Sequence, residues 1–180
     1  MKFTWNDRFF ADYSADGYVV FEGILPALLV ADLRRETDKG REIIREQKGP
    51  QVQRLQPVEK FGLDMKPFRD FAELPELNDA IRRTIGREDM WYGDTNQIGF
   101  LVEPAEMPYT TGWHRDRRFE SEKLDAEDFR VIASRRHFIN QFNCPLYQDN
   151  STWYVPDSDL RPDVPLEMEV ASKMPFESGR

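Results

Sequence analysis

Cysteine and histidine are the scarcest reactive residues of this chain. Its 180 residues include one cysteine, Cys144, and two histidines, His114 and His137. A single cysteine excludes an internal disulfide framework and any cysteine-rich zinc site. Because Cys144 has no histidine close to it in the sequence, it fits a small buried apolar group better than a nucleophile.

The chain also lacks long apolar runs and an excess of positive charge. No stretch approaches the length of a transmembrane helix, and the first residues carry no apolar run typical of a signal peptide. We therefore expect a cytoplasmic protein without a membrane partner. The net charge of −8 disfavours nucleic acid as a partner. With 39% apolar and 32% charged residues, the composition is typical of one globular domain over 1–180.

Local patterns predict a strand and two helices in the first half of the chain. Residues 17–24 are β-branched and aromatic and are bounded by glycines, which favours a strand. Apolar residues at helical spacing predict amphipathic helices over about 27–47 and 75–86. Gly49-Pro50 should end the first of these helices.

After Gly86 the pattern changes to short extended runs. A charged stretch lies among them and predicts a short helix around 125–134. The extended runs cover residues 96–102, 109–114, 136–147 and 152–155. We therefore expect a mainly β fold, in which helices of about 1–90 support a sheet formed by about 91–180.

Residues 112–116, Gly-Trp-His-Arg-Asp, place an imidazole and a carboxylate two positions apart. On an extended strand, side chains at i and i+2 leave the same face, so His114 and Asp116 could converge on one point. They would form two thirds of the 2-His-1-carboxylate triad that binds non-haem Fe(II). A His-x-Asp pair also arises by chance, and the other interpretation is a hydrogen-bonded histidine beside an unrelated carboxylate.

His137 is the other candidate for the second imidazole of such a triad. It begins the longest extended run, where it shares a face with Gln141 in strict alternation. This position is equally consistent with a structural histidine. We favour the structural interpretation, because the third ligand normally comes from a strand much further along the chain.

Amides and arginines near the His-x-Asp pair have two interpretations each. Gln97 and Gln141 lie on expected strands, where a buried amide needs a partner. That partner could be a polar cosubstrate or neighbouring sheet backbone. Arg115, Arg117 and Arg118 could bind a carboxylate or phosphate. We prefer a solvated loop, because acidic residues follow closely.

Taken together, the motifs resemble the phytanoyl-CoA dioxygenase family of Fe(II)/2-oxoglutarate-dependent oxygenases. The resemblance covers nearly the whole chain and follows the order of the family's motifs. It is carried by the segments 10–24, 68–86, 112–116 and 140–156. Of these, the His-x-Asp segment matches the family's iron motif.

The resemblance implies a double-stranded β-helix, a cupin-like jelly roll with flanking helices. It implies an oxygenase that hydroxylates a small organic molecule, with Fe(II) and 2-oxoglutarate as cofactors and succinate and CO2 as coproducts. The implied iron ligands are His114 and Asp116. The implied cofactor-contacting residues are Gln97 and Gln141, and those near the substrate entrance are Trp113 and Arg117.

The chain departs from the family pattern in two places. The family's Gly-Ser-His turn is replaced by Asp157-Ser158-Asp159. The distal histidine and the arginine that pairs with 2-oxoglutarate are expected beyond Arg180, together with the late strands of the jelly roll. The alternative to an oxygenase is therefore a truncated or degenerate relative that binds a ligand or partner without catalysis.

Overall fold

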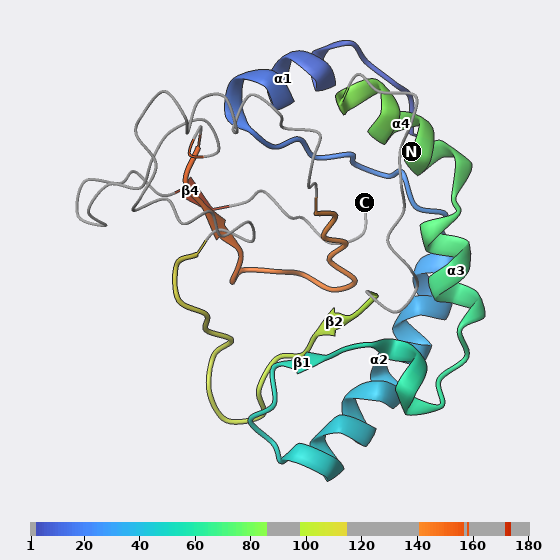
Figure 1. Cartoon of the computed structure of the whole chain (residues 1–180), viewed down its shortest axis with the longest axis vertical. Coiled ribbons are helices and arrows are strands. Elements are labelled where there is room, and N and C mark those ends of the chain that lie inside the picture. Colours follow the sequence, from blue (N-terminus) through green and yellow to red (C-terminus); the bar gives the residue numbers. More distant parts are fainter. Residues whose placement is uncertain (1–2, 86–97, 115–140, 157, 159–171, 174–180) are drawn as a thin grey trace, which may run out of the picture. The chain divides into compact units, whose positions relative to one another are not determined.

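The computed structural model describes residues 3–85, 98–114, 141–156, 158 and 172–173, and these residues are mainly helical. Two-residue strands make up the rest of the regular structure, beside one 3₁₀ helix, η1 (Val58–Phe61). The helices are α1 (Arg8–Asp16), α2 (Ala27–Lys48), α3 (Lys66–Ala72) and α4 (Pro75–Ile85) (Figure 1). None of these helices is long and apolar enough to cross a membrane.

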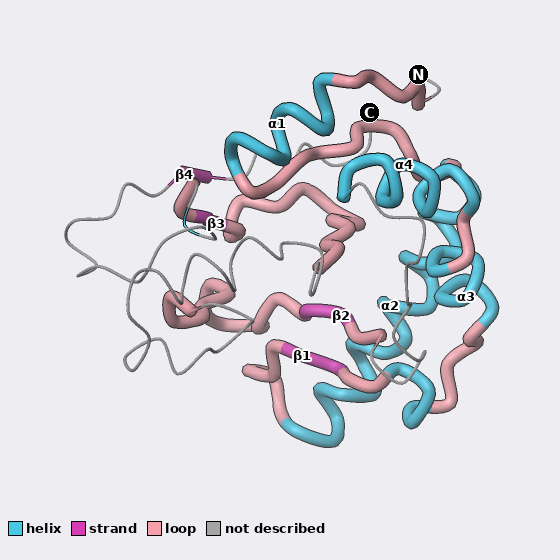
Figure 2. The backbone as a smooth tube through the Cα atoms, turned by 45° about the horizontal axis from the view of Figure 1, so that its top comes forward, coloured by secondary structure: helices cyan, strands magenta, loops and turns pink. Residues whose placement is uncertain are grey.

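The strands of the described residues form two small antiparallel pairs. β1 (Arg54–Leu55) pairs with β2 (Phe100–Leu101), with Arg54 opposite Leu101 (Figure 2). β3 (Trp153–Tyr154) pairs with β4 (Ser172–Lys173), with Trp153 opposite Lys173. The expected mainly β fold with a jelly roll is therefore wrong for this chain, whose described part is helical and contains only these short pairs.

Prolines and a side-chain hydrogen bond explain part of this error. Residues 109–114 and 141–147 are not strands in the structure. Pro104, Pro108 and Pro145 lie in or just before these runs, and proline has no N–H to donate to a neighbouring strand. The Thr110 amide donates instead to the side-chain Oε1 of Gln53, 2.8 Å away. At Thr110, a side chain thus takes the place that a neighbouring strand would have.

The expected strand over 17–24 is also absent: α1 ends at Asp16, and loop and turn follow it. Gly17 adopts φ 80° and ends α1, and its amide donates to the Tyr13 carbonyl at 3.0 Å. Left-handed backbone of this kind is common just after a helix and favours glycine. The sequence pattern did not indicate α1. The expected short helix around 125–134 lies outside the described residues.

The two helices predicted from apolar spacing are confirmed. The helix expected over 27–47 is α2, and the one expected over 75–86 is α4. Gly49 ends α2 with φ 92°, and its amide donates to the Arg45 carbonyl at 2.8 Å. Pro75 is the first residue of α4, where its missing N–H costs no helical hydrogen bond.

The chain divides into two compact units, each formed by segments distant in the sequence. The described residues of unit 1 are 3–22, 81–85, 112–114, 141–156, 158 and 172–173. Those of unit 2 are 23–80 and 98–111. The candidate residues His114 and Trp113 therefore belong to unit 1.

Unit 2 contains a close-packed apolar core on one face of α2. Ile44, Leu55 and Val58 are fully buried, and Phe68 of α3 is 3% exposed. α3 lies beside α2 in Figure 1. Gly40 of α2 faces this core, and an added Cβ would lie 2.6 Å from Cζ of Phe100. The absence of a side chain at Gly40 therefore allows β2 to approach α2.

One carboxylate, Glu36 of α2, is buried in unit 2 and is only 2% exposed. Its Oε1 accepts a hydrogen bond from the ammonium of Lys39 at 2.7 Å, and its Oε2 accepts one from the Asp64 amide at 3.1 Å. Burial acts to raise the pKa of Glu36, but these bonds and one from Arg35 outweigh it and lower the pKa. Glu36 thus joins α2 to the loop before α3.

Unit 1 contains an aromatic cluster formed by α1 and the segments on either side of it. The Phe9 ring stacks on Phe3 with centroids 5.8 Å apart, and Phe21 meets Phe9 edge to face at 5.4 Å. Trp5 also contacts Phe9, and the Arg83 guanidinium lies over the Trp5 ring at 5.4 Å. Phe21, which was expected in a strand, therefore packs its ring in this aromatic cluster.

Candidate functional site

The candidate metal ligand His114 lies in a loop of unit 1 and its side chain is exposed. Its ring Nδ1 is 2.7 Å from the carbonyl oxygen of Gly112. A local hydrogen bond between the His114 ring and the backbone two residues earlier therefore orients the ring. An added Cβ at Gly112 would meet no atom within 4 Å, so a side chain would not be excluded there by packing.

This contact determines how the proton is placed on a neutral His114 ring. A carbonyl oxygen can only accept a hydrogen bond, so Nδ1 must carry the hydrogen. The lone pair of the neutral ring is then on Nε2. Histidine ligands of metal sites commonly show the same arrangement, with one ring N–H donated to a carbonyl and the other nitrogen bound to the metal.

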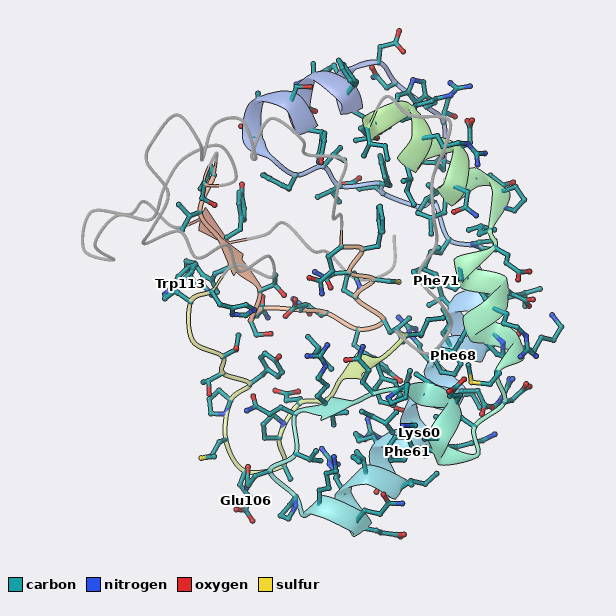
Figure 3. All side chains as sticks on the ribbon, viewed as in Figure 1. Lys60, Phe61, Phe68, Phe71, Glu106 and Trp113 are labelled. Atoms are coloured by element: carbon teal, nitrogen blue, oxygen red, sulfur yellow. The ribbon has the colours of Figure 1, made fainter. Side chains whose placement is uncertain are left out.

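Of the other predicted site residues, the structure describes Trp113 and Gln141. The Trp113 side chain is 50% exposed and projects from the end of the described 98–114 segment (Figure 3). Gln141 is exposed and lies on a loop where a strand was expected. Asp116, Arg117 and Gln97 lie outside the described residues, and so does His137. The proposed pairing of His114 with Asp116 is therefore a prediction from the sequence.

Within the described ranges, no group of three or more His, Cys, Asp or Glu side chains is arranged to hold a metal ion. The ring orientation of His114 is compatible with a metal ligand. Cys144 of unit 1 is not part of a disulfide and is partly exposed, and its role as a small packing residue stays a prediction.

A carboxylate in unit 1, Asp149, organises the loop before β3. Its Oδ1 accepts hydrogen bonds from the amide and hydroxyl of Ser151 at 2.7 and 2.6 Å, and its Oδ2 accepts one from the Thr152 hydroxyl. Burial acts to raise the pKa of Asp149, but these bonds outweigh it and lower the pKa. The carboxylate stays charged and holds the turn that leads into Trp153 and Tyr154.

A tyrosine pair in unit 1 was missed by the sequence analysis. Tyr154 of β3 donates its hydroxyl hydrogen to the hydroxyl oxygen of Tyr18, and the two ring centroids are 4.1 Å apart. Burial and the Tyr18 hydroxyl raise the pKa of Tyr154 well above its usual range. The two residues are separated by 136 positions, so no local pattern could have indicated the pair.

Comparison with known proteins adds no relative to this picture: no family model matches the chain, and no curated protein or solved structure is significantly similar to it.

Proposed function

We propose that His114 and Asp116 bind Fe(II), and that the chain is a 2-oxoglutarate-dependent oxygenase acting on a small organic molecule. One observation carries the proposal. The hydrogen bond between His114 Nδ1 and the Gly112 carbonyl gives the neutral ring the tautomer with its lone pair on Nε2. That is the form in which a histidine binds a metal while a backbone carbonyl orients its ring.

The support for this proposal is local. The jelly-roll fold that the family resemblance implied is wrong for the described residues, so the fold gives no argument for an oxygenase. What remains is the His-x-Asp spacing in the sequence and the orientation of the His114 ring. Fe(II) bound with 2-oxoglutarate would supply the oxidising power for hydroxylation, while the protein would orient the substrate.

Metal binding at His114 is tested by anaerobic titration of the purified chain with Fe(II), followed by 2-oxoglutarate. We expect Fe(II) to bind and 2-oxoglutarate to add a weak visible charge-transfer band. Removing an outer-shell partner typically lowers metal affinity roughly 10–100-fold. His114→Ala and Asp116→Ala each remove a direct ligand, so each should lower Fe(II) affinity by more than that and abolish the band.

The second histidine provides a matched control. His137→Ala should leave Fe(II) affinity unchanged, because we interpret His137 as structural. Release of succinate from 2-oxoglutarate in air should be lost in His114→Ala and Asp116→Ala and kept in His137→Ala. Equal Fe(II) affinity in the unmodified chain and His114→Ala would rule out the proposed site, and loss of binding in His137→Ala would make His137 a ligand.

The neutral ring of His114 can also be examined directly. Long-range ¹H–¹⁵N NMR distinguishes the two tautomers, and His137→Ala leaves a single histidine to assign. We expect the form with hydrogen on Nδ1. A ring with its hydrogen on Nε2 would remove the observation that carries the proposal.

A second candidate function, binding of a ligand or partner without catalysis, is favoured by the exposed aromatic residues of unit 1. Trp113, Phe142, Tyr147 and Trp153 are each at least 42% exposed. Aromatic side chains are enriched in binding surfaces. Under this alternative the Fe(II) titration gives no specific binding, and 2-oxoglutarate is not consumed.

A further inference from the structure

The Tyr18–Tyr154 pair joins two segments of unit 1 that are distant in the sequence. Tyr18 follows α1, and Tyr154 is in β3. Both side chains are partly buried, and their hydroxyl groups are joined by a hydrogen bond. The ring planes meet at 56°, with the centroids 4.1 Å apart.

The two contacts together define how the rings face each other. Close centroids and touching hydroxyl groups require the two C–O bonds to point in the same general direction. In each ring, the carbons next to the hydroxyl (the ortho carbons) lie between the ring centre and the hydroxyl group. The ortho carbons of the two rings therefore face each other. These are the carbons at which tyrosine radicals couple.

We propose that Tyr18 and Tyr154 form an oxidative cross-linking site, at which a peroxide-derived one-electron oxidant produces an intramolecular dityrosine. The proposal is independent of metal binding at His114. It concerns a covalent modification that would tie the segment after α1 to β3.

The reaction balances with hydrogen peroxide as the oxidant. Each phenol loses one electron and one proton to give a phenoxyl radical. The two radicals share their unpaired electrons in a new bond between ortho carbons, and the hydrogen on each of these carbons then moves to the phenol oxygen. In total, the protein loses two electrons and two protons, which reduce one hydrogen peroxide to two water molecules.

The surroundings of the pair favour this outcome over reaction with another chain. The rings are held in contact before oxidation, so coupling needs no diffusion, and a well-oriented intramolecular reaction is strongly favoured over a bimolecular one.

The test is treatment of the full chain with a haem peroxidase and a small amount of hydrogen peroxide. We expect dityrosine fluorescence in a band of monomer size, and a linked peptide pair containing Tyr18 and Tyr154 that is two hydrogen atoms lighter than the sum of its parts. The yield per chain should not change when the protein is diluted.

Tyr18→Phe and Tyr154→Phe should each reduce this linked pair to background, because a phenylalanine ring cannot form the phenoxyl radical. Tyr13→Phe and Tyr147→Phe are matched controls near each partner in the sequence, and both should keep the linked pair. Circular dichroism checks that each variant is folded. If only one of Tyr18→Phe and Tyr154→Phe folds, that variant alone tests the proposal.

The proposal is overturned if dityrosine within one chain forms with undiminished yield in a folded Tyr18→Phe or Tyr154→Phe variant. It is also overturned if the unmodified chain forms dityrosine only between chains, or forms none under conditions that couple free tyrosine. A linked peptide pair that contains Tyr13 or Tyr147 in place of Tyr18 or Tyr154 would overturn it as well.

Discussion

The core of unit 2 and the described segment 141–156 of unit 1 differ in how their large apolar side chains are placed. In unit 2, Leu55, Val58 and Phe68 come from different elements and are at most 3% exposed. In unit 1, the described segment 141–156 leaves Phe142, Tyr147 and Trp153 at least 42% exposed. Burial of a phenylalanine or leucine side chain typically stabilises a fold by about 1.5–3 kcal/mol. The described part of unit 2 thus has a core that stabilises it, whereas the exposed residues of unit 1 contribute little.

This difference also bears on function. A close-packed region tolerates few changes, because its side chains touch on all sides. His114, the hydrogen-bonded turn at Asp149 and the tyrosine pair all belong to unit 1. The residues with candidate chemistry therefore belong to a different unit from this apolar core, and the two can be changed by separate mutations.

The largest expected effect comes from a matched pair of phenylalanines. Phe68→Ala removes a ring that is 3% exposed and should lower the free energy of unfolding by about 3–5 kcal/mol. Phe142→Ala removes a ring that is 42% exposed and should cost well under about 1 kcal/mol. Urea unfolding followed by circular dichroism measures both. Similar losses in the two variants would contradict the contrast between the units.

A smaller effect is expected where α2 is crowded. In Gly40→Val, the added Cβ would lie 2.6 Å from Cζ of Phe100 and 2.9 Å from Cδ1 of Leu63. Overpacking a well-packed core costs typically about 1–3 kcal/mol. We therefore expect a loss of this size in urea unfolding. Gly40→Ala should be milder, because the gain in helix propensity, about 1 kcal/mol, offsets part of the strain.

If Gly40→Val is as stable as the unmodified chain, the close contact between α2 and β2 at Gly40 is contradicted. Phe100→Leu combined with Gly40→Ala then provides a second check, since a shorter side chain at position 100 should relieve the contact with the new Cβ.

The smallest expected effect concerns Glu36 and depends on pH. Its carboxyl has a lowered pKa in the folded chain, so its contribution to stability is present above the ordinary carboxyl pKa and is lost as pH falls through the lowered value. Glu36→Gln should cost about 1–2 kcal/mol near neutral pH, because hydrogen bonds to the charged group are replaced by weaker ones.

The variant should also lose stability less steeply than the unmodified chain when the pH is lowered below about 4, near the ordinary pKa of glutamate. Urea unfolding at several pH values measures this slope. Glu46→Gln on the exposed side of α2 is the control and should change neither the stability nor the slope. A steeper acid dependence in Glu36→Gln would mean that the Glu36 carboxylate is not stabilised by its partners.

The sequence allowed the helices with regular apolar spacing to be predicted, and little else of the fold. α2 and α4 repeat apolar residues at helical intervals, which is a local property. α1 has only nine residues, and Asn6, Asp7 and Gly17 at its ends were the available indications. The strands could not be predicted well, because β1 and β2 pair across a separation of more than forty residues that no local pattern encodes.

The candidate site was predicted from sequence spacing and stays a prediction. The His-x-Asp spacing made His114 a candidate ligand, and its exposed position is compatible with that role. The expected strand around it was wrong, because Pro104 and Pro108 precede it and the Thr110 amide is bound to a side chain. The Tyr18–Tyr154 contact depends on tertiary structure and could not be read from either segment alone.

The division of each unit into distant segments has a consequence for the order of folding during synthesis. Unit 2 is complete once the chain has been made up to Thr111, whereas unit 1 contains both the first residues and those after Gly112. Because synthesis is slow compared with the folding of a small compact unit, we expect unit 2 to fold first on the ribosome. Tyr18 must then wait for its partner Tyr154 until 136 further residues have been added.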